Sequence, residues 1–337
     1  MSVQMLFVIS SPRSGSTMLE QILESHSSIL GGPEPHLLTP LAHLGFWAKV
    51  DRAPYDPEAA ADALRRFVEE LPGKEGDYWA ACRAYSDVLY GQYLAGSGKS
   101  ICLDKTPAYA LVLPFLAKVF PDAKYVVLAR HPIATFSSYA NSFFDGDYQA
   151  AHRYNPLLNR YVPAIASFLR RGSPPGFHIR YEDLVLEPEL WLERIYAYIG
   201  VPFERETIDY GRSRENAPKK RGLGDPIGVR QYTRPSTQSL HKWVLELSAD
   251  SAKRSFMEEI IGSLDPGDLQ TLGYPTEEVW KPLANAPSDV TPQTTRLTQY
   301  RLQRKIIVGV RAVAQRQRIL RRSLESVRAI CATLMNE

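Results

Sequence analysis

Cysteine is scarce in this chain of 337 residues, which contains only Cys82, Cys102 and Cys331. The three are far apart, show no C-x-x-C spacing and have no His cluster nearby, so neither a disulfide framework nor a structural zinc site is predicted. The chain also lacks an apolar run of about 18 residues, a basic segment before its first apolar run and any Asn-x-Ser/Thr site. These absences disfavour a secreted or membrane-spanning protein and favour a reducing, cytoplasmic location.

A strong excess of one charge is also missing, because 40 basic side chains nearly balance 37 acidic ones, for a net charge of +3. The distribution is uneven, however. Residues 291–337 hold ten basic and two acidic side chains, a net charge of +8, whereas residues 1–290 hold 30 basic and 35 acidic ones, a net charge of −5. The composition therefore predicts no nucleic-acid partner and indicates an acidic body with a basic tail.

Short apolar runs alternate with helical patterns along the body. The run at 5–9 is apolar throughout and ends at Ser-Ser-Pro, which is typical of a strand buried on both faces, and residues 17–23 follow it with apolar positions at helical spacing. Further runs at 124–129 and 177–181 indicate more strands. This alternation predicts a single α/β, P-loop-like domain whose central parallel sheet is flanked by helices, plus a C-terminal helical extension.

The predicted domain covers residues 1–275. Within it, residues 45–100 form a helical cap, and residues 211–240 form a basic lid loop, because they lack periodicity and carry seven basic against two acidic side chains. A Pro-containing linker follows at 276–295. Residues 296–337 are predicted to form a basic amphipathic helical tail.

The tail has apolar residues spaced alternately four and three apart, with one polar position at Gln317. Three interpretations stay open: packing on the body or on a second subunit, lying on an anionic membrane surface, or binding an acidic partner protein. Packing is favoured because the acidic body supplies a complementary surface. The stripe consists of Ile306, Val310, Val313, Leu320, Leu324, Val327, Cys331 and Leu334.

The segment 10–17, between the first strand and the first helix, is expected to bind an anion, since backbone N–H groups and the positive end of a helix converge there. Compared with the nucleoside triphosphate motif G-x-x-x-x-G-K-[ST], Gly15 and Thr17 match, but serines replace the first Gly and the Lys. The cation lies inside the loop as Arg13, whose planar guanidinium suits an oxyanion. A plain turn capped by Ser and Thr is the alternative.

The hexapeptide Pro12–Thr17, Pro-Arg-Ser-Gly-Ser-Thr, resembles the 5′-phosphosulfate loop of the sulfotransferase family. Arg130 and Ser138 resemble the family's second signature, which is an Arg after a strand and a Ser eight positions later. This resemblance implies that the donor is 3′-phosphoadenosine 5′-phosphosulfate and that Arg130 and Ser138 hold its 3′-phosphate. It also implies that the 5′-phosphate is bound by Ser14, Gly15, Ser16 and Thr17, with Arg13 beside them.

Three further segments are similar to segments of that family: Asp104–Pro107, Arg180–Val185 and His241–Trp243. The resemblance implies that Lys105 faces the sulfuryl group, that Tyr181 lies near the adenosine and that Lys242 lies near the nucleotide phosphates.

The catalytic base distinguishes branches of the family. Cytosolic members acting on phenols and steroids use a His at the position of Pro107. The segment Gly32–Leu38, Gly-Pro-Glu-Pro-His-Leu-Leu, instead resembles the branch of the tyrosylprotein enzymes and of bacterial polyketide-pathway enzymes, which place a Glu after the first helix. This implies that Glu34 is the general base, kept ionised by a cation such as Arg13, with His36 as the alternative.

We therefore expect a sulfotransferase that moves the sulfuryl group to a hydroxyl of a small-molecule or carrier-linked acceptor, without a metal ion. Arg13 and Lys105 would offset charge on the transferring group and the bridging oxygen. A missing His after Gly224–Pro226 weighs against a carrier-bound substrate. The alternatives are a P-loop kinase using a nucleoside triphosphate, and a non-catalytic nucleotide-binding scaffold with a basic interaction tail. Aromatic candidates for an acceptor pocket are Tyr139, Phe143, Phe144 and Tyr148.

Overall fold

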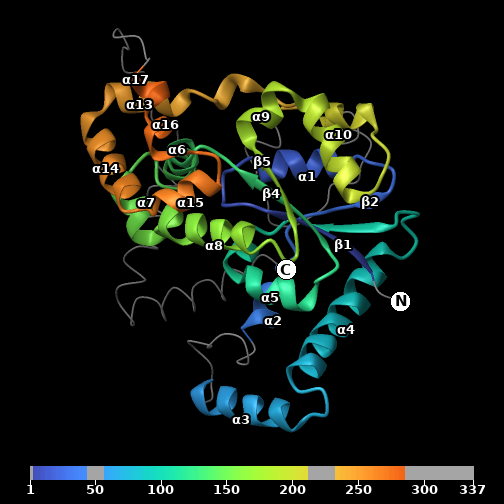
Figure 1. The fold of residues 1–337 in the computed structure, drawn as a ribbon. Helices are drawn as coiled ribbons and strands as arrows, with labels where there is room; N and C mark the ends of the chain where they lie inside the picture. The colour runs from blue at the N-terminus through green and yellow to red at the C-terminus, as the bar shows by residue number, and fades with distance from the viewer. Residues whose placement is uncertain (1–2, 44–56, 212–231, 285–337) are drawn as a thin grey trace, which may run out of the picture.

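The computed structural model of the chain describes residues 3–43, 57–211 and 232–284 (Figure 1). The predicted tail 296–337 and most of the predicted lid loop 211–240 lie outside these residues. The described elements are, in chain order, β1 (Gln4–Ile9), α1 (Ser16–Glu24), β2 (Ile29–Leu30), α2 (Leu38–Ala42), α3 (Pro57–Glu70), α4 (Glu75–Leu94), β3 (Ile101–Asp104), η1 (Pro107–Val112), α5 (Leu113–Val119), β4 (Lys124–Ala129), α6 (Pro132–Phe143), α7 (Tyr148–Tyr154), α8 (Leu157–Arg171), β5 (Gly176–Arg180), α9 (Tyr181–Leu186), α10 (Pro188–Ile199), η2 (Arg205–Asp209), η3 (Thr237–Ser239), α13 (Lys242–Ala249), α14 (Ser251–Gly262), α15 (Pro266–Thr271), α16 (Thr276–Val279) and α17 (Lys281–Ala284).

The central sheet has five parallel strands in the order β2-β3-β1-β4-β5. The first strand lies in the middle, where Leu6 is opposite Leu103 of β3 on one side and Lys124 of β4 on the other. Since all five strands run the same way, the segments that follow them emerge at one edge of the sheet. This edge brings together residues that are far apart in the sequence.

Both faces of the sheet are buried, as the continuous apolar run of β1 predicts. Met5, Phe7 and Ile9 belong to a hydrophobic cluster with residues of α5, α6, α8 and α13, whereas Leu6 and Val8 belong to a second cluster with residues of α1, α9 and α10. Figure 1 shows these two helical layers on opposite sides of the sheet. The predicted α/β fold, with a parallel sheet flanked by helices, is confirmed.

The predicted cap region 45–100 contains α3 and α4, which pack on each other, and α4 also packs on α5 and β3. In Figure 1, α3 lies at the end of this hairpin that is farther from the sheet. No helix in the described ranges combines the length and the apolarity that crossing a membrane requires.

The body of the protein extends beyond the predicted boundary at residue 275. Residues 276–284, predicted as the start of a linker, form α16 and α17, and Val279 and Leu283 are buried in the main hydrophobic cluster. The prolines of this stretch suggested a linker, but Pro275 and Pro282 precede or open short helices, where proline costs no intrahelical hydrogen bond. The predicted linker assignment is therefore wrong for 276–284.

Candidate active site

A cavity of about 610 Å³ opens where the segments that follow the strands converge. It is lined by residues after β1, β2, β4 and β5 and by residues of α6 and α13. Two predicted site residues, Ser14 and Lys105, are buried behind the lining. The predicted site residues that line the cavity are Arg13, Gly15, Ser16, Thr17, Glu34, His36, Arg130, Ser138, Tyr181 and Lys242.

The loop between β1 and α1 has a shape that only glycine permits at position 15. Gly15 has a φ of 90°, and a Cβ added there would lie 2.5 Å from a ring carbon of Tyr181. Arg13 also has a left-handed φ, of 71°, which is uncommon for a residue with a side chain. The Ser14 hydroxyl is turned to Ser11, at 2.6 Å between the oxygens. The first turn of α1 is thus presented to the cavity through Gly15, Ser16 and Thr17.

Arg130 follows β4 directly and is held by backbone oxygens. Its Nη1 donates to the carbonyl of Arg13 at 3.1 Å and its Nη2 to the carbonyl of Ser239 at 3.1 Å, and the guanidinium carbon lies 4.6 Å from the ring centre of Tyr181. Its Nε is buried and donates to no acceptor within the described part of the chain. Burial lowers the pKa of Arg130. A partly buried guanidinium that lines the cavity and has a spare donor fits an anionic ligand such as a phosphate.

Ser138 lies on α6 opposite this loop. Arg13 Nε donates to Ser138 Oγ at 3.3 Å, and the Arg13 guanidinium carbon is 6.0 Å from the ring centre of Phe143 at the end of the same helix. Arg13 therefore links the loop between β1 and α1 to α6, and it contacts Ser138, the residue that the motifs predicted to bind a phosphate together with Arg130.

The aromatic side chains near the cavity differ from the predicted set. Phe143 lines it, whereas Tyr139 and Tyr148 are buried in the main hydrophobic cluster and Phe144 packs against that cluster. Tyr161 of α8 also lines the cavity. The sequence offered no signal for Tyr161, because α8 is far from every motif and its other buried residues indicate a core helix.

Glu34 and Lys105 form the closest ion pair at the cavity wall. Lys105 Nζ lies 2.6 Å from Glu34 Oε1, and His36 Nε2 lies 3.6 Å from Glu34 Oε2. Burial alone would lower the pKa of Lys105, but the two nearby carboxylates outweigh it and the pKa lies above its usual value. Lys105 is therefore the cation beside Glu34, the role that the sequence motifs suggested for Arg13.

A second carboxylate, which the motifs do not predict, contacts the same ammonium. Glu20 Oε2 lies 3.1 Å from Lys105 Nζ, and Thr17 Oγ1 accepts from that nitrogen at 3.4 Å. Burial raises the pKa of Glu20 to about 8, although the nearby Lys105 opposes this rise. The sequence signal for Glu20 is its position: it lies three residues after Thr17, next to the buried Leu19 of α1. An acidic residue on the buried side of a helix calls for a partner.

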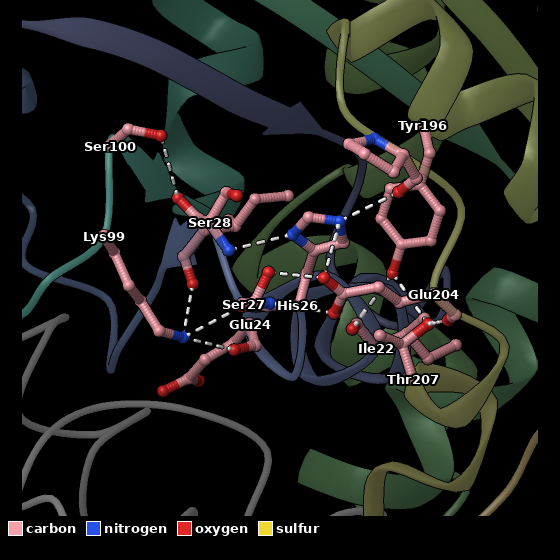
Figure 2. A network of polar contacts seen from close by, with 12 residues as sticks. Ile22, Glu24, His26, Ser27, Ser28, Lys99, Ser100, Tyr196, Glu204 and Thr207 are labelled. Carbon is pink, nitrogen blue, oxygen red and sulfur yellow. Dashed lines mark hydrogen bonds and ion pairs between the residues drawn. The ribbon is translucent and has the colours of Figure 1, made fainter.

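The turn after α1 is held by a polar network that links it to β3 and to the segment before η2 (Figure 2). His26 is fully buried, and its Nδ1 accepts from the Ser28 N–H at 2.9 Å, so its Nε2 carries a proton and donates to the Pro202 carbonyl at 2.9 Å. Lys99, just before β3, donates to three carbonyls at 2.9, 3.1 and 2.7 Å, those of Glu24, His26 and Ile29. This network fixes the end of α1, and with it the start of the chain segment that carries Glu34.

The chain is similar to known proteins over most of the site. A family model described as "Sulfotransferase family" matches residues 5–205. Nodulation protein NoeE of Sinorhizobium fredii is 30% identical over 217 residues, which cover 58% of this chain and 49% of NoeE. Protein-tyrosine sulfotransferase 1 of Danio rerio is 23% identical over 261 residues, covering 73% of this chain and 67% of that protein. The chain thus spans about half the length of NoeE and two thirds of the second relative.

A solved structure agrees with the fold. The sulfotransferase domain from the olefin synthase of Synechococcus PCC 7002 superposes with a TM-score of 0.50 at 24% sequence identity, covering 72% of this chain and 88% of that domain. This likeness supports the α/β architecture described above.

Proposed function

The chain belongs to the sulfotransferase family, and from that membership we propose that it transfers the sulfuryl group of 3′-phosphoadenosine 5′-phosphosulfate to a hydroxyl of a small-molecule or carrier-linked acceptor. The observation that supports this most is a single cavity that combines two anion-binding features with a carboxylate. The two anion-binding features are the first turn of α1 and the partly buried guanidinium of Arg130, and the carboxylate is that of Glu34. A cytoplasmic location is part of the proposal.

We assign the two phosphate groups of the donor to two different parts of the cavity. We assign the 5′-phosphosulfate to Arg13 and to the backbone N–H groups at the start of α1, where the helix end favours an anion. We assign the 3′-phosphate to Arg130, whose buried Nε has a proton to donate, and to Ser138. We assign the adenosine to the surroundings of Tyr181, whose ring centre lies 4.6 Å from the guanidinium carbon of Arg130.

Glu34 would act as the base in the transfer. Its carboxylate takes the proton of the acceptor hydroxyl while that oxygen forms a bond to sulfur, and the bond from sulfur to the bridging phosphate oxygen breaks. Arg13 offsets the charge that develops on the leaving oxygen. The products are the sulfate ester, 3′-phosphoadenosine 5′-phosphate and protonated Glu34. We expect no metal ion to be needed.

The acceptor would enter beside Glu34, where His36, Phe143 and Tyr161 line the cavity. Phe143 and Tyr161 offer aromatic faces to a ring or an alkyl chain. A screen of hydroxyl compounds and carrier-linked hydroxyl substrates with labelled donor is the direct way to identify the acceptor.

Nucleotide binding tests the proposed donor site. We expect calorimetry to show binding of 3′-phosphoadenosine 5′-phosphate in the presence of EDTA. Arg130→Ala should weaken this binding by about 10- to 100-fold, because charge-assisted hydrogen bonds to the 3′-phosphate are lost. Adenosine 5′-phosphate, which has no 3′-phosphate, serves as the control and should lose little affinity in the same variant.

Three results would contradict parts of the proposed function. Equal losses for both nucleotides would remove Arg130 from the 3′-phosphate site. Tighter binding of ATP with Mg²⁺ than of 3′-phosphoadenosine 5′-phosphate would favour the kinase alternative. Nucleotide binding without any sulfuryl transfer in the acceptor screen would favour the scaffold alternative.

The basic tail 296–337 is proposed to pack on the body or on a second copy of the chain, with an anionic membrane surface and an acidic partner protein as the alternatives. Deleting residues 296–337 should lower the oligomer mass measured by light scattering, or reduce adsorption to anionic vesicles if the membrane alternative holds. A deletion variant with unchanged mass, unchanged adsorption and unchanged thermal stability would rule out packing and membrane contact.

A further inference from the structure

Glu20 contacts Lys105 from the interior of the protein, whereas Glu34 contacts it from the cavity wall. The distances to Lys105 Nζ are 3.1 Å from Glu20 Oε2 and 2.6 Å from Glu34 Oε1, and Thr17 Oγ1 lies 3.4 Å away. An ammonium has three N–H donors, so these three acceptors use all of them. Lys105, which is 1% exposed, is thereby held in one orientation.

The charge of this cluster depends on one proton. With both carboxylates ionised, Glu20, Lys105 and Glu34 carry a net charge of −1; with one carboxylate protonated, they carry none. A buried negative cluster would oppose an anionic donor. Protonating Glu20 gives up less solvation and less attraction to the ammonium than protonating Glu34. Glu20 is the more buried of the two, with 8% against 14% of its side chain exposed, and it lies farther from Lys105 Nζ.

We propose that Glu20 is a positioning residue for sulfuryl transfer. It anchors Lys105 from the interior and holds the proton of the cluster, so that Glu34 remains ionised and can act as the base. This role rests on the proposed function. It extends that function by assigning to Glu20 the proton that the cluster of Glu20, Lys105 and Glu34 holds before the reaction.

The surroundings of Glu20 support this assignment. Burial raises its pKa to about 8, and Lys105, from the end of β3, only partly opposes the rise. Glu24 on the same helix and Glu34 after β2 add to it. In the neutral range Glu20 therefore holds its proton. It loses that proton as the pH rises through about 8, and the cluster then becomes negative.

The pH profile of turnover tests the role of this proton. Wild type should lose activity as the pH rises through about 8, while Glu20→Gln, an isostere of the protonated acid, should keep activity within about threefold of wild type at pH 7 and lack this alkaline loss. Glu20→Leu removes the acceptor, so kcat should fall by about 10- to 100-fold with little change in the KM for donor.

Proton uptake on nucleotide binding gives a readout that is independent of turnover. Calorimetry with 3′-phosphoadenosine 5′-phosphate near pH 8, in buffers of different ionisation enthalpy, should show that wild type takes up part of a proton, because an incoming anion favours the protonated form of Glu20. Glu20→Gln should show less uptake. Glu69→Gln, at an exposed carboxylate of α3 that is not among the charges acting on Glu20, is the control and should take up protons as wild type does.

The outcomes separate the two proposals. If wild type binds no 3′-phosphoadenosine 5′-phosphate, the proposed function fails, and the role of Glu20 fails with it. If wild type and Glu20→Gln bind the nucleotide with equal proton uptake and equal alkaline profiles, only the role of Glu20 is refuted. Turnover of Glu20→Leu equal to that of Glu20→Gln would refute the anchoring of Lys105.

Discussion

Glu34→Gln should lower kcat by about 100-fold or more while leaving nucleotide binding close to wild type, since a general base contributes typically 10²- to 10⁴-fold. Glutamine keeps the shape of the side chain and can still accept from Lys105, which lies 2.6 Å from Glu34 Oε1. It cannot take the acceptor proton. Single-turnover kinetics with labelled donor measure the loss of chemistry, and calorimetry with 3′-phosphoadenosine 5′-phosphate measures binding.

His36→Gln is the comparison for this variant, because the His36 ring lies 3.6 Å from Glu34 and also lines the cavity. We expect it to lose less activity than Glu34→Gln. Near-normal turnover of Glu34→Gln, together with a large loss in His36→Gln, would transfer the role of base to His36. His36 has a left-handed φ of 51°, so His36→Asn offers a second substitution at this position, because asparagine tolerates that conformation.

Lys105→Met should lower turnover by about 10²- to 10³-fold, because the cation that pairs with the proposed base is lost. It should also destabilise the fold. Removing one partner of a buried ion pair costs about 3–5 kcal/mol, since the remaining charges are left uncompensated. Glu20 and Glu34 are the carboxylates that lose their partner.

This loss of stability should depend on pH. Protonation neutralises the two carboxylates that lack a cation in Lys105→Met. The free energy of unfolding of this variant should therefore be closest to that of wild type at low pH and should fall progressively below it as the pH rises. Urea unfolding at several pH values measures this. Lys118→Met, which replaces an exposed lysine of α5, is the matched control and should leave stability and turnover unchanged. A Lys105→Met variant with a pH-independent loss would show that the carboxylates do not set its stability.

The sheet was predictable where the strands are long and apolar, as in β1 and β4. β2 and β3 have two and four residues, too few for periodicity to reveal. Tyr181, expected at the end of a strand, instead begins α9. Element boundaries of this kind depend on packing that local sequence does not record.

The sequence by itself determined the α/β alternation and the loop between the first strand and the first helix, and it singled out Glu34 as the candidate base, because each depends on residues adjacent in the chain. The segment from Pro12 to Thr17 carries its own turn, cation and helix start. Only the tertiary structure decided which cation meets Glu34 and that Glu20 shares it. These contacts join α1, the segment after β2 and the end of β3, which become neighbours through the strand order β2-β3-β1. Chain order does not specify strand order, so the distances that set proton affinities at the site exist only in the folded protein.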